Sequence, residues 1–430
     1  MTETALSQMI NISYSESEGD VAKTISVNGQ TSTNLRTRST LGGDLAEDWA
    51  TGFLRGVPIR SALPTTRSVR SAELFCGSGG LGLGVREAAQ ELGFDYASLA
   101  CLDHDPDAVE VYAANHGSPL KSACSATEIV DYNVSGQGAE AEFLYEPEIL
   151  DPRWANLKGR VDVLMAGPPC QGHSNLNNRT RRTDKRNQLY LTVPAIAVAL
   201  QVDAVIIENV QAVVHDRSEV VATTIQLLRM AGYTVETGVI SALSTGWPQT
   251  RKRFFLVARR GVDPIPISTV VEASTAPQRD LRWAIDGLGE VNDSDDLHIS
   301  VELSEENRRR IDFLFDNNMF DLPNSERPEC HQDGTTYGSV YGRLRGDQAA
   351  PTITTGFLTP GRGRYIHPFE RRTLSPREAA RIQGYPDSYL FSPDPKRPAS
   401  KAKLTKWIGD AVPMPLGYVA GLSALAPLIT

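Results

Sequence analysis

The fold of this chain is decided by the stretch Val161-Asp-Val-Leu-Met-Ala-Gly-Pro-Pro-Cys-Gln-Gly-His-Ser-Asn-Leu-Asn-Asn-Arg-Thr180. Its apolar run Val163–Ala166 is short and rich in branched residues, which indicates a buried strand. Gly167 and two prolines end that strand abruptly, because proline cannot donate to a strand ladder. Cys170 is therefore expected at the carboxyl end of a strand, which is the edge where open α/β sheets bind ligands.

Cys170 has two interpretations. A single cysteine in a long chain is most often a small buried apolar side chain. The rigid Pro-Pro loop instead favours a nucleophile held in one direction. Its thiolate would need nearby positive charge, because a thiol with a pKa of about 8.5 is only partly ionised at neutral pH. A basic run that follows is equally well explained as a solvated loop, and it comprises Arg179, Arg181, Arg182, Lys185 and Arg186.

Composition and charge restrict the class of protein. The chain has 430 residues, of which 40% are hydrophobic, and this is enough for a globular fold of two domains. A net charge of -9 means that any nucleic-acid site must be a local basic patch. Five cysteines without a Cys-x-x-Cys pair indicate reduced thiols, and neither a disulfide framework nor a metal site. Without a signal peptide or a run of eighteen apolar residues, we expect a cytoplasmic protein.

The order of predicted elements indicates a mostly parallel sheet covered by helices, which is an α/β fold. Strands are expected at 69–76, 96–102, 163–166, 204–207, 233–241 and 253–258. The alternation of strands and helices stops at Arg260, and helical order returns near Ser375. We therefore expect a mobile tail at 1–67 with one short helix near Leu45–Leu54, a catalytic and cofactor-binding domain at 68–259, a smaller domain at 260–370, and a return to the first domain at 371–430.

The first of these strands ends with Glu73-Leu-Phe-Cys76, and a glycine-rich turn follows it, Gly77-Ser-Gly-Gly-Leu-Gly-Leu-Gly84. Its glycines allow a ligand to approach the backbone closely, although a tight turn alone would also explain them. The carboxylate of Glu73 suits a cationic cofactor, and Asp103 at the next strand end can accept hydrogen bonds from ribose hydroxyls. S-adenosylmethionine meets both conditions. A solvated strand end is the alternative for Asp103 and His104, followed by a helix that Asp105 is expected to cap and Pro106 to begin.

Two further motifs suggest acid and base chemistry at the same edge. Glu208 follows the apolar residues 204–207, so desolvation would raise its pKa and favour a proton donor. An exposed acid at a strand end is the other interpretation. Strand alternation puts Arg251 and Arg253 on one face, where they can hold a carboxylate or polarise a base carbonyl, unless they are simply a basic surface.

Taken in order, the motifs resemble those of the DNA cytosine-5 methyltransferases. They are 73–80, 167–172 (Gly-Pro-Pro-Cys-Gln-Gly), 208–210 (Glu-Asn-Val), 249–253 (Gln-Thr-Arg-Lys-Arg), 377–381 (Arg-Glu-Ala-Ala-Arg) and 409–413 (Gly-Asp-Ala-Val-Pro). The resemblance covers about 70–259 and 371–421. It leaves out the middle segment, which in that family is the variable target-recognition domain. It implies a Rossmann-like, S-adenosylmethionine-dependent methyltransferase fold acting on double-stranded DNA.

The resemblance also implies roles for individual residues. Cys170 would attack carbon 6 of a flipped-out cytosine, and Glu208 would stabilise the base at ring nitrogen 3. Arg253, with Arg251, would hold the base and Glu208. The base must leave the duplex, because the reacting groups cannot reach both faces of a stacked ring. The cofactor would be bound by Glu73, Phe75, Gly77, Gly79, Gly80, Asp103, His104, Pro168 and Asp410.

Three positions depart from the pattern of that family. No acidic residue lies near Cys124, where the family commonly binds the adenine amino group. His173 replaces a common Phe in the loop whose Gln171 and Ser174 are expected to contact DNA. Asp410 stands where Asn is usual, and its extra negative charge would weaken cofactor binding unless it is paired.

Sequence specificity is expected in the segment 260–370. Arg343, Arg345, Arg362 and Arg364 lie there in glycine-rich surroundings. Arginine can read guanine bidentately, or it can merely neutralise phosphate, and both roles are open for each of the four.

Three alternatives were weighed against DNA methylation. A tRNA-methylating branch of the same family usually carries a Cys-Phe-Thr signature, which is not found after Glu208. A non-catalytic relative would not need Cys170, Glu208 and both arginines. A nicotinamide dehydrogenase would explain the glycines but not Pro-Pro-Cys-Gln. The expected partners are duplex DNA and a restriction endonuclease encoded elsewhere, and a monomer is favoured.

Overall fold

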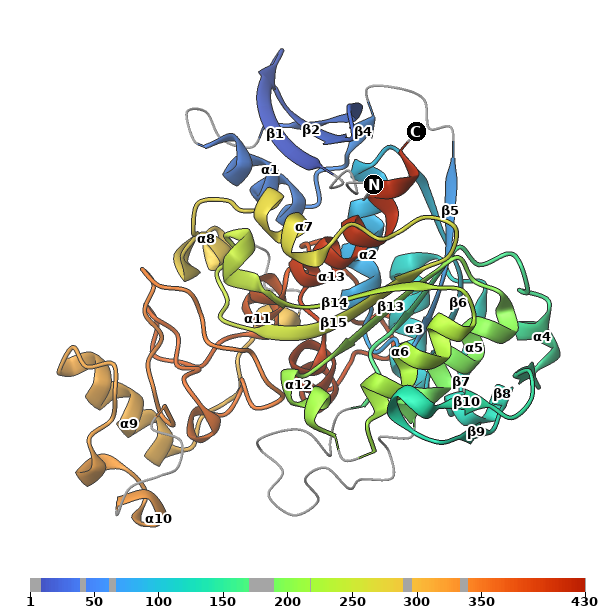
Figure 1. Ribbon diagram of the computed structural model, residues 1–430. Coiled ribbons are helices and arrows are strands. Elements are labelled where there is room, and N and C mark those ends of the chain that lie inside the picture. Colours follow the sequence, from blue (N-terminus) through green and yellow to red (C-terminus); the bar gives the residue numbers. More distant parts are fainter. Residues whose placement is uncertain are drawn as a thin grey trace.

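The computed structural model describes residues 9–38, 44–61, 67–169, 189–216, 218–288, 296–332 and 339–429. Its largest element is a seven-stranded sheet (Figure 1). In spatial order the strands are β14 (Thr234–Ser241), β15 (Lys252–Arg259), β13 (Ala204–Asn209), β12 (Val163–Ala166), β5 (Ser68–Leu74), β6 (Asp95–Asp103) and β7 (Leu120–Ala123). β15 runs antiparallel to both neighbours, and the pairs from β13 to β7 are parallel. The predicted α/β fold with a mostly parallel sheet is confirmed.

Both faces of the sheet are buried, because successive residues of a strand point alternately into two apolar cores. In β12, Val163 and Met165 join one core, and Leu164 and Ala166 join the other. The helices that contribute to the first core include α2 (Gly80–Glu91), α3 (Pro106–His116), α7 (Ile267–Ala273) and α13 (Met414–Leu425), and those of the second core include α4 (Pro152–Ala155), α5 (Thr192–Leu200) and α6 (Val220–Met230).

Helices α2 and α13 pack against each other at very short range. A Cβ atom on Gly84 would lie 2.3 Å from the Met414 carbonyl oxygen, so only glycine fits there. One helical stretch, Lys401–Leu428, is long and apolar enough to cross a membrane by length and composition, and 83% of its apolar window is buried inside the protein. This stretch consists of two helices, α12 (Lys401–Asp410) and α13, with a break between them that ends at Pro413.

The predicted mobile tail is wrong for residues 10–38 and 44–61. They form an antiparallel sheet of β1 (Ile10–Ser17), β2 (Asp20–Val27), β3 (Gln30–Thr37) and β4 (Arg60–Ser61) with the predicted helix α1 (Leu45–Leu54), and we call this part the amino-terminal unit (Figure 1). Its hairpins turn at Glu18-Gly19 and Asn28-Gly29, where all four residues have positive φ. Asn-Gly between apolar strands is a strong hairpin signal, and the Ser- and Thr-rich composition obscured it.

The remaining elements lie at the periphery of the sheet or follow β15. Those between β7 and β12 are β8 (Val130–Asp131), β9 (Val134–Ser135), β10 (Glu142–Phe143) and β11 (Glu148–Ile149). The later helices are α8 (Leu281–Ile285), α9 (Glu305–Asp316), α10 (Glu329–Gln332) and α11 (Pro376–Gln383). β7 was not predicted, since its four residues, Leu-Lys-Ser-Ala, lack an apolar pattern.

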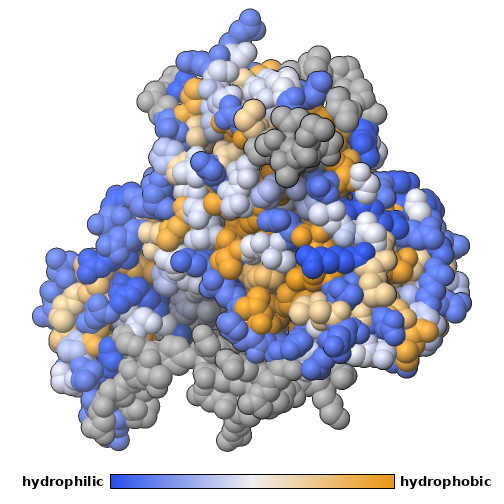
Figure 2. Space-filling model, in the orientation of Figure 1, coloured by the Kyte–Doolittle hydropathy of each residue, from blue (hydrophilic) through white to orange (hydrophobic). Residues whose placement is uncertain are grey.

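A small separate core surrounds α9, within the expected second domain. Its buried residues are Ile311, Leu314, Leu322, Val340, Tyr341 and Ile366, and we call the described residues from 303 to 366 the target lobe. Hydrophilic side chains cover most of this lobe on the face shown in Figure 2, where it lies at the lower left. The 260–370 segment also contributes to the first core of the sheet, through Leu281 before the target lobe and through Ile353 within it.

Candidate active site

The glycine-rich turn follows β5 and leads directly into α2. Phe75, Gly77 and Gly79 all have positive φ, so the backbone bends sharply at the carboxyl end of the strand. At Gly80, a Cβ atom would lie 2.3 Å from the Val412 carbonyl oxygen, which explains why glycine is needed there. The turn therefore exposes its backbone to the space above the sheet edge.

Asp103 ends β6 and holds this turn in place. Its Oδ2 accepts a hydrogen bond from the Gly77 N–H at 2.9 Å, and its Oδ1 accepts one from the Asp105 N–H at 2.9 Å. The His104 Nδ1 lies 3.0 Å from Asp103 Oδ1, and the His104 side chain is 77% exposed. Asp105 caps α3, as predicted, through hydrogen bonds from the backbone N–H groups of Asp107 and Ala108.

Glu73 is buried beside the turn, with 1% of its surface exposed. Its Oε2 makes no hydrogen bond with any described residue, although Tyr112 and Gly82 lie near. Burial raises the pKa of Glu73 to about 8. At neutral pH this carboxyl is therefore largely protonated, whereas the sequence suggested an anion.

Glu208 lies near the end of β13 and is paired with Arg253. The Arg253 Nε lies 2.9 Å from Glu208 Oε1, and both side chains are largely buried. Burial raises the pKa of Glu208 above its ordinary value, although Arg253 and Arg251 act to lower it. Oε2 is the atom nearest to a Cβ built on Gly167, at 3.7 Å, so Glu208 faces the loop that leads to Cys170.

Arg251, two residues before Arg253, hydrogen-bonds to backbone carbonyl groups. Its Nη1 donates to the carbonyl oxygens of Ile353 at 2.9 Å and Gly409 at 3.0 Å. The side chain is 4% exposed. Arg251 thus connects the start of β15 to two distant segments and also acts to lower the pKa of Glu208, and its role in holding Glu208 together with Arg253 stays a prediction.

One cavity of about 530 Å³ joins these groups at the carboxyl edge of the sheet. Every predicted site residue of the sheet edge that the structure describes lines it: Glu73, Phe75, Gly77, Gly79, Gly80, Asp103, His104, Pro168, Glu208, Arg251, Arg253 and Asp410. We call it the edge cavity. Cys170, Gln171 and Ser174 lie outside the described residues, which stop at Pro169 on the cavity wall.

Asp410 lies at the rim of the edge cavity, with a side chain that is 60% exposed. Its Oδ2 lies 3.4 Å from Nζ of Lys406, one helical turn earlier. The extra negative charge is therefore paired and solvated. No acid stands at Ala123 or Cys124. The next carboxylate along the chain, that of Glu128, accepts a hydrogen bond from the Ser125 N–H at 2.8 Å.

Several positioning residues were missed by the sequence analysis. Asn209 donates from Nδ2 to the Pro168 carbonyl oxygen at 3.2 Å and so fixes the Gly-Pro-Pro loop. Trp407 donates to Asp105 at 2.9 Å, and its own carbonyl oxygen accepts from Ser78 at 2.9 Å. The motif Glu208-Asn-Val210 contained a signal for Asn209. Trp407 had none, because its partner is 302 residues away.

The four arginines of the second domain divide into two pairs. Arg343 donates to the Pro368 carbonyl oxygen at 2.6 Å and lies 3.8 Å from the Phe315 ring centroid. Arg364 donates to the carbonyl oxygens of Phe320 and Arg343, each at 2.9 Å. These two guanidiniums hold the target lobe together. The other two, Arg345 and Arg362, are exposed.

A second polar cluster lies where the target lobe meets α11. His367, Glu370 and Glu378 are close enough to hold a metal ion. However, His367 Nδ1 accepts hydrogen bonds from the backbone N–H groups of Phe369 and Glu370 at 3.1 and 2.9 Å. Burial acts to raise the pKa of Glu378, but hydrogen bonds from Arg372 and His367 bring it to about 2. The lone pairs of His367 and Glu378 are thus already used in hydrogen bonds within the protein, and the cluster has a structural role where the target lobe contacts α11.

Comparisons with known proteins agree on one family. The family model described as C-5 cytosine-specific DNA methylase matches residues 69–423. The Type II methyltransferase M1.BsuMI of Bacillus subtilis is 38% identical over 365 residues, which span 84% of this chain and 81% of that protein. The Type II methylase M.HgiDII of Herpetosiphon aurantiacus is 32% identical over 359 residues, which span 82% of this chain and 93% of that protein.

Solved structures support the same fold. A DNA modification methyltransferase encoded within an Escherichia coli prophage has a TM-score of 0.54 at 21% identity, covering 83% of this chain and 98% of its own. The Dnmt2 methyltransferase of S. pombe has a TM-score of 0.53 at 19% identity, covering 84% of this chain and 99% of its own. The amino-terminal unit lies outside the residues that the family model matches.

Proposed function

Because this chain belongs to the C-5 cytosine-specific DNA methylase family, and is therefore a DNA cytosine-5 methyltransferase, we propose that the edge cavity is its active site. The proposal rests on one observation: the glycine-rich turn and the Glu208–Arg253 pair line the same cavity. A methyl donor and a base bound there would lie side by side. The tRNA alternative is not favoured, since the matching family is described as acting on DNA.

We propose that the donor is S-adenosylmethionine, whose sulfonium supplies an electrophilic methyl group when bound. The residues present fit such a ligand. The turn at Gly77 and Gly79 presents its backbone to the cavity, Asp103 lies at the strand end expected to meet a ribose, and Glu73 retains an oxygen without a hydrogen bond from any described residue. Asp410 and His104 would lie at the solvent-facing rim.

At the other end of the edge cavity, Glu208 would hold a flipped-out cytosine. A carboxyl with a raised pKa can donate its proton toward ring nitrogen 3, and Arg253 fixes its orientation. We propose that the Cys170 thiolate forms a bond to carbon 6, which makes carbon 5 nucleophilic. After methyl transfer, loss of the carbon 5 proton and elimination of the thiolate would restore the ring. Asn209 would act as a positioning residue for the cysteine loop.

We further propose that the target lobe reads the DNA sequence, mainly through Arg345 and Arg362, and that the protein acts in the cytoplasm as the modification partner of a restriction endonuclease encoded elsewhere. The relatives named as Type II methyltransferases support this role. A single chain contains all the residues assigned above, so we propose a monomer.

Expression in a host that lacks cytosine methylation, followed by genome-wide mapping of 5-methylcytosine, tests both activity and target. We expect methylation at one short recurrent sequence. A genome without 5-methylcytosine, from cells that contain soluble protein, would contradict the assignment.

The Cys170→Ser variant tests the nucleophile. We expect undetectable methyl transfer with cofactor binding retained, because a hydroxyl is a far weaker nucleophile than a thiolate. Tritiated cofactor measures transfer, and duplex DNA with 5-fluorocytosine at the target should form a denaturant-resistant adduct with the parent alone. Residual turnover within about tenfold of the parent would show that Cys170 is not the nucleophile.

A further inference from the structure

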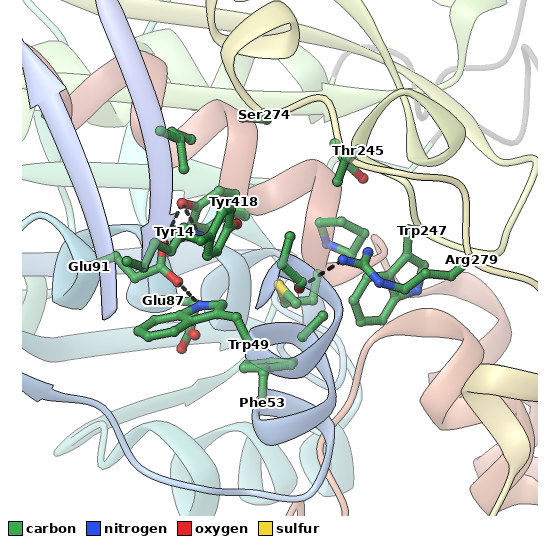
Figure 3. A pocket seen from close by; sticks show the side chains of 17 residues that line it. Tyr14, Trp49, Phe53, Glu87, Glu91, Thr245, Trp247, Ser274, Arg279 and Tyr418 are labelled. Atoms are coloured by element: carbon green, nitrogen blue, oxygen red, sulfur yellow. Dashed lines mark hydrogen bonds and ion pairs between the residues drawn. The ribbon is translucent and has the colours of Figure 1, made fainter. Parts of the chain in front are cut away.

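A second cavity, of about 80 Å³, lies where the amino-terminal unit covers the methylase fold, and we call it the amino-terminal cavity (Figure 3). Its walls are mainly aromatic and apolar. Trp49 and Phe53 come from α1, Trp247 from the turn before β15, and Met414 and Tyr418 from α13. Such a wall favours an apolar body.

The charges at one end of this cavity are already balanced. Lys23 lies 2.6 Å from Glu91 and donates to the Tyr418 hydroxyl at 3.0 Å. Glu87 is paired with Arg36 at 2.7 Å. In Figure 3, Glu87 and Glu91 lie on the side opposite Arg279. A ligand would therefore find no unbalanced charge at this end.

The opposite end contains a buried guanidinium without a counter-ion. Arg279 is 6% exposed, and its Nη atoms donate only to the carbonyl oxygens of Gly246 and Ala46, at 3.3 and 2.9 Å. Its Nε donates to no described residue, its guanidinium carbon lies 5.0 Å from the Trp283 ring centroid, and no ion pair joins it to a carboxylate of the described residues. Burial lowers the pKa of Arg279, and the more distant Tyr14, Glu47 and Asp44 offset this only partly.

A second polar atom is also without a partner at the same cavity. The Oγ atom of Ser274, at the end of α7, makes no hydrogen bond with any described residue. In Figure 3 these two residues lie on different sides of the cavity, so they offer two separate donors and not one paired site. Water alone would satisfy them poorly, because an ordered water needs two to four polar partners and most of this wall is apolar.

We propose that the amino-terminal cavity binds a small organic monocarboxylate with an apolar body. The carboxylate accepts from Arg279 Nε and supplies the missing negative charge, and the apolar part fills the space between Trp49, Phe53 and Met414. Inorganic anions fit this wall poorly, since they have no apolar surface to bury. The site includes the amino-terminal unit, which the family model does not match, and it is separate from the edge cavity.

Calorimetric titration of the full chain tests this proposal with benzoate and hexanoate as probes. Acetate is the control for the carboxylate alone, and benzyl alcohol is the control for the apolar body alone. We expect saturable binding of at least one probe, and affinities about tenfold or more lower for both controls. Each titration is repeated with S-adenosylhomocysteine blocking the edge cavity, and the binding should be unchanged.

Two variants locate the binding site. Arg279→Gln should weaken the probe about tenfold or more, whereas Arg282→Gln, an exposed arginine three residues later, should not change it. Ala50→Leu should exclude the probe by filling the cavity while Arg279 is retained, and it carries the test if Arg279→Gln does not fold. Thermal unfolding checks that each variant is folded.

Three results would overturn the proposal. They are absence of saturable binding to the parent, displacement of the probe by S-adenosylhomocysteine, and unchanged binding in both Arg279→Gln and Ala50→Leu.

Discussion

The edge cavity and the target lobe use their charged residues in opposite ways. In the cavity, Glu208 and Arg253 lie at the ends of adjacent strands and face each other. In the target lobe, Arg343 and Arg364 point inward and donate to backbone carbonyls. The lobe has little regular structure, so its carbonyl oxygens need side-chain donors, and the five N–H groups of arginine supply them. The partner of a charged residue at a strand end can therefore be predicted from sequence, whereas the partner of a charged residue in a loop cannot.

The largest effect should come from Glu208→Gln. An amide cannot transfer the proton, and it leaves Arg253 without its counter-ion, so we expect kcat to fall by about 10²- to 10⁴-fold. Steady-state transfer with the parent DNA site measures this. The matched control is Glu236→Gln on the neighbouring edge strand β14, which should retain parental kcat.

The pH profile distinguishes a proton donor from a merely structural acid. If Glu208 must be protonated, kcat falls as pH rises through its raised pKa. Arg253 lowers that pKa, so Arg253→Gln, although slower, should shift the falling limb to higher pH. A limb that stays at the parental pH would exclude Glu208 as the titrating donor.

A second buried carboxyl, Glu73, should affect stability more than chemistry. Its pKa in the folded protein is about 8, compared with 4.5 for the ordinary carboxyl. Between these values the folded protein holds more protons than the unfolded chain, so the free energy of unfolding decreases as pH rises. Glu73→Gln should therefore be more stable than the parent near pH 8, by about 1.4 kcal/mol per pKa unit, and nearly equal near pH 5.

Thermal unfolding at the two pH values measures this difference. The exposed Glu140→Gln is the control and should follow the parent at both. An equal effect of Glu73→Gln at both pH values would mean that the carboxyl is ionised throughout the range.

The target lobe provides the next contrast. Arg345→Ala and Arg362→Ala should keep the parental Tm, and a base-reading residue should cost about 1–3 kcal/mol at the true site and relax specificity at one position. A phosphate contact would weaken all sites alike and lower the salt dependence. Arg343→Ala and Arg364→Ala should instead lower Tm and leave the recognised sequence unchanged. Methylation of a randomised DNA library, with Tm for each variant, separates the pairs.

A different result for Arg343 would contradict the division of the four arginines into a structural pair and a DNA-reading pair. If Arg343→Ala kept the parental Tm but changed the recognised sequence, its contact with the Pro368 carbonyl oxygen would be incidental.

The sequence predicted six of the seven strands of the central sheet, and it did so best for β12 and β13, which are apolar runs with clear ends. β12 was predicted at its observed bounds, and Asp105-Pro106 marked the start of α3 correctly. The amino-terminal unit was missed because its strands are half polar, although Asn28-Gly29 signalled a hairpin. The Ser- and Thr-rich composition of this unit concealed the turn signal that its sequence contains.

The edge cavity was predicted better than the contacts within it. Every predicted residue of the sheet edge that the structure describes lines the cavity, since strand ends on one edge of a parallel sheet must converge. The partners of Arg251 and Trp407 could not be predicted, because they come from segments 102 to 302 residues away. Protonation of Glu73 depends on its burial against Gly82 and Tyr112, and sequence alone does not give the extent of that burial.

The smallest effect should come from Asp410→Asn. The sequence alone suggested that this substitution tightens cofactor binding, because it removes a negative charge near the ligand. In the structure Asp410 is 60% exposed and lies 3.4 Å from Lys406, so solvent and the lysine already screen that charge. We therefore expect the calorimetric Kd for S-adenosylmethionine to change less than about threefold, because exposed pairs contribute at most about 1 kcal/mol. Lys406→Met is the more sensitive test, because it leaves Asp410 without its ion pair at the rim. It should raise the Kd for S-adenosylmethionine by more than Asp410→Asn changes that Kd. A large tightening by Asp410→Asn would show that the carboxylate turns inward toward the cofactor when DNA or cofactor is bound.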